Sequence, residues 1–398
     1  MSKGKVAIIG VGNVPCGYYP ERSALEGAIY ASVGAIKDAG INKDDIDLCL
    51  TTSVLADPGG LTVELATGRM VEELGLKNCN NNFQVFSGGS SSTNCIKVAE
   101  GMIAAGTASM VLCVHTDKLG SGFDHLGIDV QQIFTTAGFS PEWEQPFGMS
   151  MHAITTMGLN RYVYESNGKV TDEQLASVAV SDRKWAEMNP MAAYRDPITV
   201  EDVLNSGKLP SGMNKLEIAN FLDGSNAFIV TSVDLAEKLV DKPVYVWGSG
   251  SVVDHCLIAS SDDCFRQNNR EASTKAFNEA GLVIDDLDFA SIYDFTTSAQ
   301  VYGFEEVCFL ETGDGPAFFA EGHGAPGGKF PVTTNGGMLS EGHTGAGGGY
   351  ATLVETIRQL MGKAGERQIP NCKKGLYNTS GGTGGDSNVT IFGTDRPE

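Results

Sequence analysis

The chain has 398 residues, of which 41% are hydrophobic and 19% charged, so it is long enough for two ordinary domains with sizeable cores. Its formal net charge of −21 and the lack of any block of Lys and Arg exclude nucleic-acid binding, which needs a cationic surface to release phosphate counterions. An anionic ligand has to be held by local groups instead. The nine cysteines are spread singly, which indicates reduced thiols and argues against a structural zinc site.

The N-terminus passes from a short polar stretch into an apolar run at 6–9. That run is too short for a secretory signal and far too short to span a bilayer, and no other stretch approaches the spanning length. We therefore expect no membrane span and a cytoplasmic location.

Apolar runs with the length of buried strands alternate with segments of helical periodicity. Strands are expected at 5–10, 46–52, 82–86 and 109–115, and helices at 23–39, 62–74 and 91–105. Strands that alternate with helices favour parallel pairing, with right-handed crossovers that cover both faces of a sheet. The predicted class is α/β.

A long internal repeat indicates how the chain is organised. The segment Ala35–Leu48, AIKDAGINKDDIDL, is answered by Ala276–Phe289, AFNEAGLVIDDLDF, with Ala, Gly and Asp positions in common. Copies this far apart indicate duplication of a whole domain, because solenoid repeats have much shorter periods. We place one half at about 1–235 and the other at about 242–398.

The first half carries an insertion at about 118–211 with helices of its own. One helix is expected from Thr171, where Gln174 completes a capping signal, to a stop at Asn189-Pro190. An insertion of this size at one end of a doubly wound sheet is typical of a lid or a substrate wall. The sequence thus predicts two sheets, one lid and one composite cleft.

Three motifs, in this order and over nearly the full chain, resemble those of the thiolase superfamily. Ser291–Phe295, SIYDF, resembles the strand end that places a water-holding Asn or His in classical members. Gly336–His343, GGMLSEGH, with the helix that ends at Gly362, resembles the Gly-His segment and its following helix. Asn378–Gly385, NTSGGTGG, resembles the C-terminal Cys-x-Gly-Gly-Gly turn. The resemblance implies a duplicated thiolase fold, with two βαβαβαββ halves in a layered αβαβα core.

Both thiols of the thiolase reaction are missing from the matching positions, as in the subgroup of sterol-carrier-protein type that lacks the nucleophilic Cys. The family nucleophile is a Cys at the start of a helix, and its position here is Gly89. The second family Cys, which shuttles a proton, is matched by Thr379. Ser87 or Ser90 with His343 as base is an alternative nucleophile, although a hydroxyl without a dedicated triad is much weaker than a thiolate.

The glycine-rich turn at Gly89 and Ser90 offers unobstructed N–H groups at a helix N-terminus, where a thioester enolate oxygen can be stabilised. On its residues alone the turn is equally well a plain N-cap, and the resemblance favours the oxyanion interpretation. The resemblance adds Gly381, in the C-terminal glycine turn, as a second source of N–H groups.

Tyr293 stands where classical members carry Asn or His, and a thiolase-like subgroup of retro-aldolases uses tyrosine as acid and base. The plain alternative is an aromatic residue packed at a strand end. His343 matches the family histidine and precedes a run of glycines that lets a ligand approach the backbone. His323 lies in a turn-rich loop that resembles a family loop bordering the site, and its alternative is a structural role.

The resemblance implies an enzyme that makes or breaks a carbon–carbon bond in an acyl-CoA thioester. Aldol or retro-aldol chemistry on a β-hydroxyacyl-CoA needs an enolate but no Cys acyl-enzyme, with Tyr293 and His343 as acid and base. One alternative is a thiolase or C-acyltransferase with an atypical nucleophile. Another is a non-catalytic thiolase-like subunit of a heteromeric complex. CoA enters as part of the substrate, with no permanently bound cofactor and no metal.

The resemblance also implies protein partners. Thiolases pair through the sheet edge of the first half, and related chains without the Cys often work with a small OB-fold protein that carries a zinc ribbon. We therefore expect a homodimer, which becomes a heterotetramer where that partner is present. Arg183, Lys184 and Arg195 in the insertion are candidates for the CoA phosphates by location only.

Overall fold

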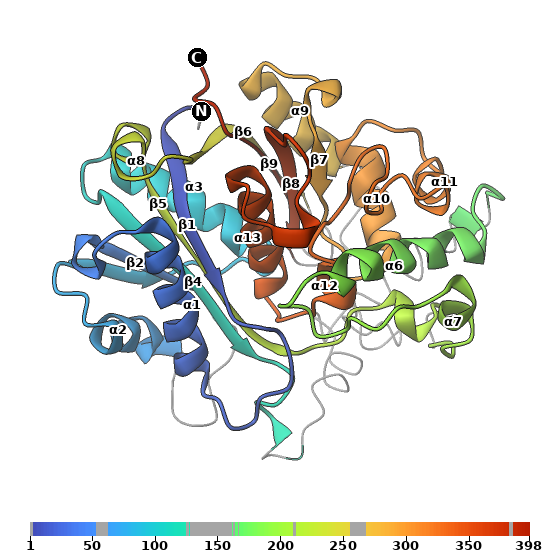
Figure 1. The fold of residues 1–398 in the computed structure, drawn as a ribbon, viewed down its shortest axis with the longest axis horizontal. Helices are drawn as coiled ribbons and strands as arrows, with labels where there is room; N and C mark the ends of the chain where they lie inside the picture. The colour runs from blue at the N-terminus through green and yellow to red at the C-terminus, as the bar shows by residue number, and fades with distance from the viewer. Residues whose placement is uncertain are drawn as a thin grey trace.

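The structure is a computed structural model that describes residues 3–52, 63–124, 127, 161, 164–165, 167–209, 212–254, 268–381 and 385–398. Within these ranges the strands form one sheet in the order β3-β2-β4-β5-β1-β6-β9-β8-β7 (Figure 1). The strands are β1 (Val6–Asn13), β2 (Leu48–Thr52), β3 (Asn81–Gln84), β4 (Met110–Lys118), β5 (Asp223–Ser232), β6 (Val244–Val253), β7 (Phe289–Ser291), β8 (Lys374–Gly381) and β9 (Asp386–Gly393). The helices are α1 (Ala24–Ala39), α2 (Val63–Leu74), α3 (Ser91–Ala104), α6 (Asp172–Glu187), α7 (Val200–Leu204), α8 (Val233–Leu239), α9 (Asn268–Ala280), α10 (Thr297–Val307), α11 (Gly315–Ala320), α12 (Gly337–Ser340) and α13 (Gly347–Met361).

Two parts of the sheet have the same topology. In the first, β1 and β4 pair antiparallel with β5, and β2 pairs parallel with β4. In the second, β6 and β8 pair antiparallel with β9, and β7 pairs parallel with β8. The parts join where β1 pairs antiparallel with β6. The parallel pairing expected from the sequence holds for β2 with β3 and β4, but β1 pairs antiparallel with its neighbours, because β5, which follows the long insertion, lies between β1 and β4.

The internal repeat has the same local structure in both copies. Each helix ends at a glycine with positive φ, 66° at Gly40 and 72° at Gly281, a conformation that glycine adopts without steric cost. A short 3₁₀ helix follows, at Lys43–Asp45 and at Ile284–Asp286, and then a buried strand. The predicted duplication is thus present in the backbone, while the boundaries at 235 and 242 stay a prediction.

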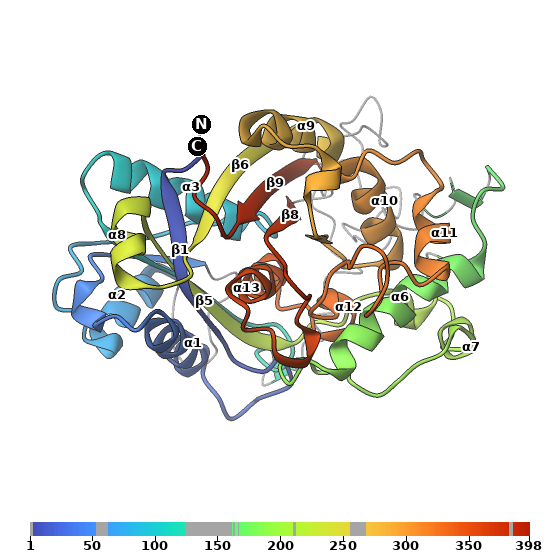
Figure 2. The ribbon, with the colours of Figure 1, turned by 45° about the horizontal axis from the view of Figure 1, so that its top comes forward.

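Five layers of helices and strands build the core, as the tilted view shows (Figure 2). One cluster of buried side chains joins α1 to the outer face of the first part of the sheet, and another joins α9 and α10 to the second part. Between them, α3 and α13 share a cluster with inward residues of β1, β4 and β8. Alternate residues of β1, Ala7 and Ile8, belong to different clusters because successive strand residues point to opposite faces. Helices α3 and α13 are therefore the central layer.

The described part of the insertion packs over the second half of the chain. Helix α6 contacts α10, α11 and α12. Thr171 caps it as predicted, since its hydroxyl accepts from the Gln174 N–H and the Gln174 side chain accepts from the Thr171 N–H. The lid role of the insertion stays a prediction, because much of it lies outside the described residues. Across the described ranges, no helix has the length and apolar character required to cross a bilayer.

A glycine on β1 sets how closely α1 can pack. A Cβ added at Gly12 would overlap the Ala31 carbonyl oxygen and lie 2.5 Å from the Ala35 nitrogen, whereas one added at Gly101 on α3 would meet nothing within 4 Å. We expect Gly12→Ala to lower the free energy of unfolding by about 1–3 kcal/mol through overpacking. Gly101→Ala should raise it by about 0.5–1 kcal/mol, because alanine favours the helix. Urea denaturation measures the free energy of unfolding of both variants. Equal effects of Gly12→Ala and Gly101→Ala would contradict the close packing of α1 on β1.

Candidate functional site

The turn before α3 is fixed by its own polar side chains. The Ser91 hydroxyl accepts from the Ser87 N–H at 2.9 Å and donates to the Gly88 carbonyl at 2.6 Å. Gly88 has a φ of 57°, which favours glycine. Ser90, at the N-cap position, makes no side-chain capping bond. Ser90 is therefore not a plain N-cap. The N–H groups of Gly89 and its neighbours lie at the buried N-terminal end of α3.

Tyr293 lies against this turn. It follows β7, and a Cβ added at Gly89 would lie 2.5 Å from Tyr293 Cζ and even closer to its hydroxyl oxygen. A Cβ added at Gly381, the last residue of β8, would lie 2.7 Å from the Ser87 carbonyl oxygen. The structure thus brings together Gly89, Tyr293 and Gly381 from three separate elements. Burial, with the neighbouring Asp294 carboxylate, raises the pKa of the Tyr293 phenol, so the phenol stays protonated near neutral pH.

The first turns of α3 and α13 meet beside this cluster. A Cβ added at Gly349 would overlap the Gly89 carbonyl oxygen and lie 3.1 Å from Ser92 Oγ. The Tyr377 hydroxyl donates to the Gly349 carbonyl at 2.6 Å and lies 2.6 Å from Ser92 Oγ. Two helix N-termini therefore point at one region, where their dipoles both favour negative charge.

His343 lies on the segment after α12, and its ring is near enough to His115 for an electrostatic interaction, while the His115 ring fills the space beside Gly347 at the start of α13. Its N–H donates to the Asn220 carbonyl at 3.1 Å, and its carbonyl accepts from the Leu222 N–H at 2.9 Å. The Gly345 N–H donates to His343 Nδ1 at 3.1 Å, and the ring meets Phe221 edge-on at 4.9 Å. Because Nδ1 accepts, Nε2 carries the proton of the neutral ring. Burial lowers the pKa of His343 to about 4, so near neutral pH the ring is a hydrogen-bond donor at Nε2.

Helix α12 connects Tyr293 with His343. Asp294, next to Tyr293, accepts from the Met338 N–H at 2.9 Å and from the Leu339 N–H at 3.2 Å. Met338 and Leu339 also pack against the Tyr293 side chain. Burial raises the pKa of the Asp294 carboxyl to about 7, against these two hydrogen bonds. Asp294, missed from the sequence, thus anchors the segment that leads to His343, and its place in the SIYDF motif was the available signal.

A second histidine, His115, lies buried on β4. His115 and Asp117, two residues apart on β4, point to the same face, and His115 Nε2 lies 2.8 Å from Asp117 Oδ2 with both side chains fully buried. A Cβ added at Gly347 would overlap the His115 ring and lie beside Thr344 Oγ1. The ring also disfavours a positive charge on His343. The lack of a side chain at Gly347, the first residue of α13, therefore leaves room for the His115 imidazole, as well as for any ligand that approaches the backbone.

Of the two remaining candidates, Ser90 lies beside this cluster and His323 lies apart from it. Ser90 is fully buried, and its hydroxyl faces Gly381 and Asp386, with no hydrogen-bond partner among the described residues. A serine–histidine pair that could activate Ser90 is therefore not formed in the described part of the chain. His323 follows α11, is 38% exposed, and contacts Glu321 at 3.0 Å and Phe318. Its contacts do not join it to Tyr293 or His343.

Some residues weighed from the sequence lie outside the described ranges. They are His125, His152 and His255, the methionines Met149, Met151 and Met157, and residues 382–384 of the C-terminal glycine turn. Of the candidates for the CoA phosphates, Arg183 is buried and donates to Ser340 Oγ and to the Asp196 carbonyl, which indicates a structural role.

Three comparisons with known proteins match this architecture. A family model described as "Thiolase C-terminal domain-like" matches residues 250–394. The acetyl-CoA acetyltransferase of Methanothermobacter thermautotrophicus is 29% identical over 97% of this chain and 99% of that protein. The steroid side-chain-cleaving aldolase of Thermomonospora curvata is 29% identical over 99% of both chains. A solved structure described as "Ltp2-ChsH2(DUF35) aldolase" superposes with a TM-score of 0.83 at 25% identity, over 100% of this chain and 99% of that one.

The fold is similar to the thiolase fold, and in the site a tyrosine hydroxyl lies against the Gly89 turn that precedes α3. The comparisons confirm the resemblance to the thiolase superfamily that was read from the sequence. Its relatives include both an acyltransferase and an aldolase.

The contact between Gly89 and Tyr293 predicts a specific coupling. Gly89→Ala should destabilise the chain by about 1–3 kcal/mol, because the new methyl group overlaps both the phenol and the Ser380 carbonyl oxygen, of which only the phenol overlap depends on Tyr293. Tyr293→Ala should cost about 3–5 kcal/mol by leaving a cavity. In the double variant the methyl group enters that cavity. Its destabilisation should therefore be smaller than the sum of the two single-variant effects by about 0.5–3 kcal/mol. Urea denaturation of the cycle measures this coupling. Gly101→Ala, also on α3, should be additive with Tyr293→Ala, and an additive result for Gly89→Ala would contradict the contact.

The low pKa of His343 predicts a pH-dependent stability. The neutral ring stabilises the folded chain above its ordinary pKa of 6.5, and this contribution is lost as the pH falls toward the folded value of about 4. His343→Gln removes the loss. The free energy of unfolding of this variant, relative to wild type, should therefore rise by up to about 2 kcal/mol between about pH 7.5 and about pH 5. Chemical denaturation at the two pH values measures the shift, and a constant difference would show that His343 titrates normally.

Proposed function

We propose that the chain breaks or forms a carbon–carbon bond in an acyl-CoA thioester, by retro-aldol or aldol chemistry on a β-hydroxyacyl-CoA. The observation that carries the proposal is the Tyr293 hydroxyl at the Gly89 turn, in the space where a nucleophilic side chain would start. A proton-transfer group replaces a nucleophile there, while the two helix N-termini remain. The aldolase relatives, at 29% and 25% identity over nearly the full chain, support the same reaction.

In the cleavage direction, Tyr293 Oη accepts the proton of the β-hydroxyl as the bond between Cα and Cβ breaks. The Cβ–O group becomes a ketone or an aldehyde, and the bonding electrons move into a thioester enolate. In the same step the Tyr293 phenol gives its own proton to Cα, so that Oη never carries two protons and the shorter acyl-CoA is formed. The phenol passes one proton in and one out, so it need not be ionised, in agreement with its raised pKa.

The enolate oxygen is the charge that the site has to stabilise. One hydrogen-bond donor to the enolate oxygen is His343 Nε2–H, which carries the ring proton because Nδ1 accepts from the Gly345 N–H. The N–H groups at Gly89 and Gly381 are the others. We therefore propose His343 as a hydrogen-bond donor to the enolate and not as the base. Ser90 and His323 have no step in this scheme.

The acyltransferase relative, with the same 29% identity, supports a second candidate function. A thiolase or C-acyltransferase reaction here would need an atypical nucleophile, and the nearest hydroxyls are Ser87 and Ser90. Ser87 Oγ accepts from Asn94 Nδ2 at 2.6 Å, and Ser90 Oγ is buried. Neither has a histidine as hydrogen-bond partner among the described residues, which favours the aldolase proposal.

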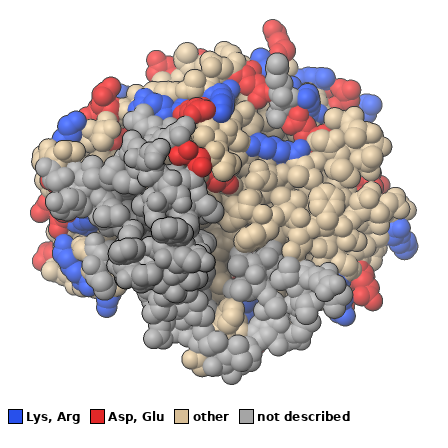
Figure 3. All heavy atoms as spheres, turned by 180° about the vertical axis from the view of Figure 1, so that it is seen from behind, with Lys and Arg blue, Asp and Glu red and all other residues tan. Residues whose placement is uncertain are grey.

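Assembly belongs to the proposal as well. Strand β3 is the sheet edge of the first half, and Phe83 and Phe86 near it are 38% and 54% exposed. Seen from behind, the side that carries this half has a broad stretch without charged side chains (Figure 3). An unpaired edge with exposed aromatic rings supports a homodimer through β3. The similarity to the Ltp2-ChsH2(DUF35) structure supports a partner protein, for which the resemblance read from the sequence implies the small OB-fold and zinc-ribbon type.

The test combines turnover with intact-protein mass spectrometry on the purified chain. With β-hydroxyacyl-CoA thioesters, Tyr293→Phe should lower kcat by about 10²–10⁴. His343→Ala should lower it by about 10²–10³, and His343→Gln, which keeps an N–H donor, by less. Ser90→Ala is the matched control and should retain wild-type turnover without any covalent adduct. A stable acyl adduct that disappears in Ser87→Ala or Ser90→Ala would establish the acyltransferase instead.

A further inference from the structure

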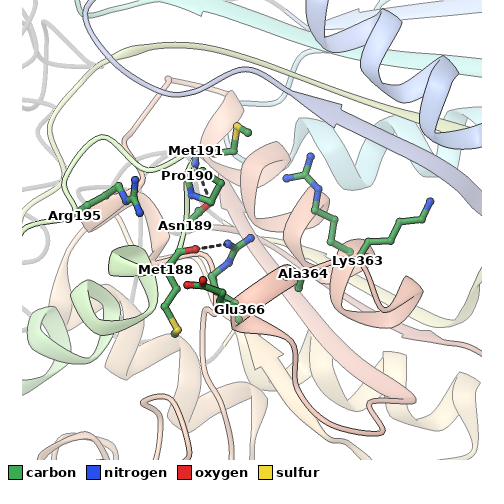
Figure 4. Close-up of a pocket in the computed structure, with 11 residues that line it drawn as sticks. Met188, Asn189, Pro190, Met191, Arg195, Lys363, Ala364 and Glu366 are labelled. Carbon is green, nitrogen blue, oxygen red and sulfur yellow. Dashed lines mark hydrogen bonds between the residues drawn. The ribbon is translucent and has the colours of Figure 1, made fainter.

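A second pocket lies at the far end of the central helix. The Gly89 turn meets the first turn of α13, whereas this pocket is at its C-terminal end (Figure 4). The 15-residue helix spans about 22 Å, so the two places are well separated. The pocket has a volume of about 540 Å³, within the range of small-molecule sites. It is lined by residues 188–191, Arg195, Arg358 and residues 363–367.

The charge of the lining is opposite in sign to the net charge of the whole chain. Four of its side chains are basic, Arg195, Arg358, Lys363 and Arg367, and one is acidic, Glu366. The whole chain has 28 basic and 49 acidic residues, so this concentration of cations is local. A walled pocket lined by one sign of charge focuses the field on a ligand of the opposite sign.

Two of the four cations are already neutralised. Arg367 donates from Nε and Nη2 to the Glu355 carboxylate, at 3.1 and 2.8 Å, and from Nη1 to the Met188 carbonyl at 3.0 Å. Lys363 Nζ pairs with Asp38 at 2.5 Å. These two groups shape the wall, and their charges are balanced.

The other two guanidinium groups are paired less closely, although the buried Glu341 carboxyl is near enough to Arg358 for the two groups to interact electrostatically. Arg358 Nη2 donates to Asn13 Oδ1 at 2.7 Å, and Arg195 Nη2 donates to the Glu187 carbonyl at 2.9 Å. Neither forms an ion pair within the described ranges. Each is held by one neutral acceptor, which orients the planar fork of donors and leaves its other N–H groups for a ligand.

The C-terminal dipole of α13 would oppose an anion if its last carbonyls were bare. They are capped instead. Gly362, with a φ of 73°, donates to the Gln359 carbonyl at 3.2 Å, and the Lys363 N–H donates to the Arg358 carbonyl at 2.8 Å. The helix end therefore offers an anion little repulsion.

We propose that this pocket binds a small organic phosphate at a site separate from the catalytic centre. A phosphate group carries about two negative charges and three acceptor oxygens, which suits two forked guanidinium groups better than a single carboxylate does. Apart from Asn189 and Gly365, the remaining lining is apolar, with Met188, Pro190, Met191 and Ala364 as a surface for the carbon skeleton. The proposal does not depend on the reaction proposed above.

Isothermal titration calorimetry of the full chain with pyrophosphate and with ADP tests this site. Arg195→Gln and Arg358→Gln should each weaken binding by about tenfold or more. Glu366→Gln removes the one acidic side chain of the lining and should strengthen binding by about threefold, an effect that unfolding cannot imitate. The matched controls are the exposed residues Lys238→Gln and Glu311→Gln, which make the same charge changes elsewhere and should leave the Kd unchanged.

Three outcomes would overturn the proposal. Absence of saturable binding for both probes would mean that the lining does not form a phosphate site. An equal loss in Lys238→Gln would mean that the probe responds to overall charge only. Displacement of pyrophosphate by free CoA, dependent on Arg358, would assign the pocket to the nucleotide end of a CoA substrate and not to a separate ligand. Circular dichroism of each variant confirms that the fold is retained.

Discussion

The close approach of α3 and α13 is the constraint on which the rest of the molecule depends. Two helices that begin side by side, in the middle layer of five, can do so only if their first turns lack side chains at the point of contact. Gly89 and Gly349 meet that condition, and Tyr377 holds the two backbones at this distance. The strands β7 and β8 then end where the helices begin, and they deliver Tyr293 and Gly381 to the same place.

The ionisable groups around this point share one property. Burial lowers the pKa of the His343 imidazole, raises that of the Tyr293 phenol, and raises that of the Asp294 carboxyl to about 7. All three shifts favour the neutral form, because the charged form has lost its water. A negative charge that develops on a substrate therefore meets few competing ions, and the helix N-termini and the His343 Nε2–H act on it with little screening.

The sequence allowed a correct prediction of features that depend on neighbours in the chain. The cap at Thr171, the repeated helix stops at Gly40 and Gly281, and the strand and helix periods all follow from local geometry. The duplicated fold followed from the repeat and the motifs together. Strand direction could not be read in the same way, since alternation of elements does not tell whether a strand re-enters parallel or antiparallel, as the place of β5 demonstrates.

The same distinction between local sequence features and contacts made by the fold applies to the candidate site. Gly89, Tyr293 and Gly381 came from motif positions, but their mutual contact joins residues about two hundred or more positions apart and needed the fold. The pair His115 and Asp117 is adjacent on a strand, yet only the position of Gly347 indicates what the imidazole faces. The protonated nitrogen of His343 depends on the Gly345 N–H, which no spacing rule predicts. For His323 the loop resemblance was a weaker guide, because its described contacts stay within its own loop and the neighbouring helix.

The fit between Gly89 and Tyr293 also restricts how such a chain could change its chemistry over time. A thiol at position 89 and a phenol at position 293 need the same space, so a lineage cannot carry both. A path from this site toward a cysteine nucleophile has to shorten the side chain at 293 first, and the reverse path has to lose the cysteine first. The two chemistries are therefore separated by an intermediate that has neither group, which makes a direct exchange by single substitutions costly.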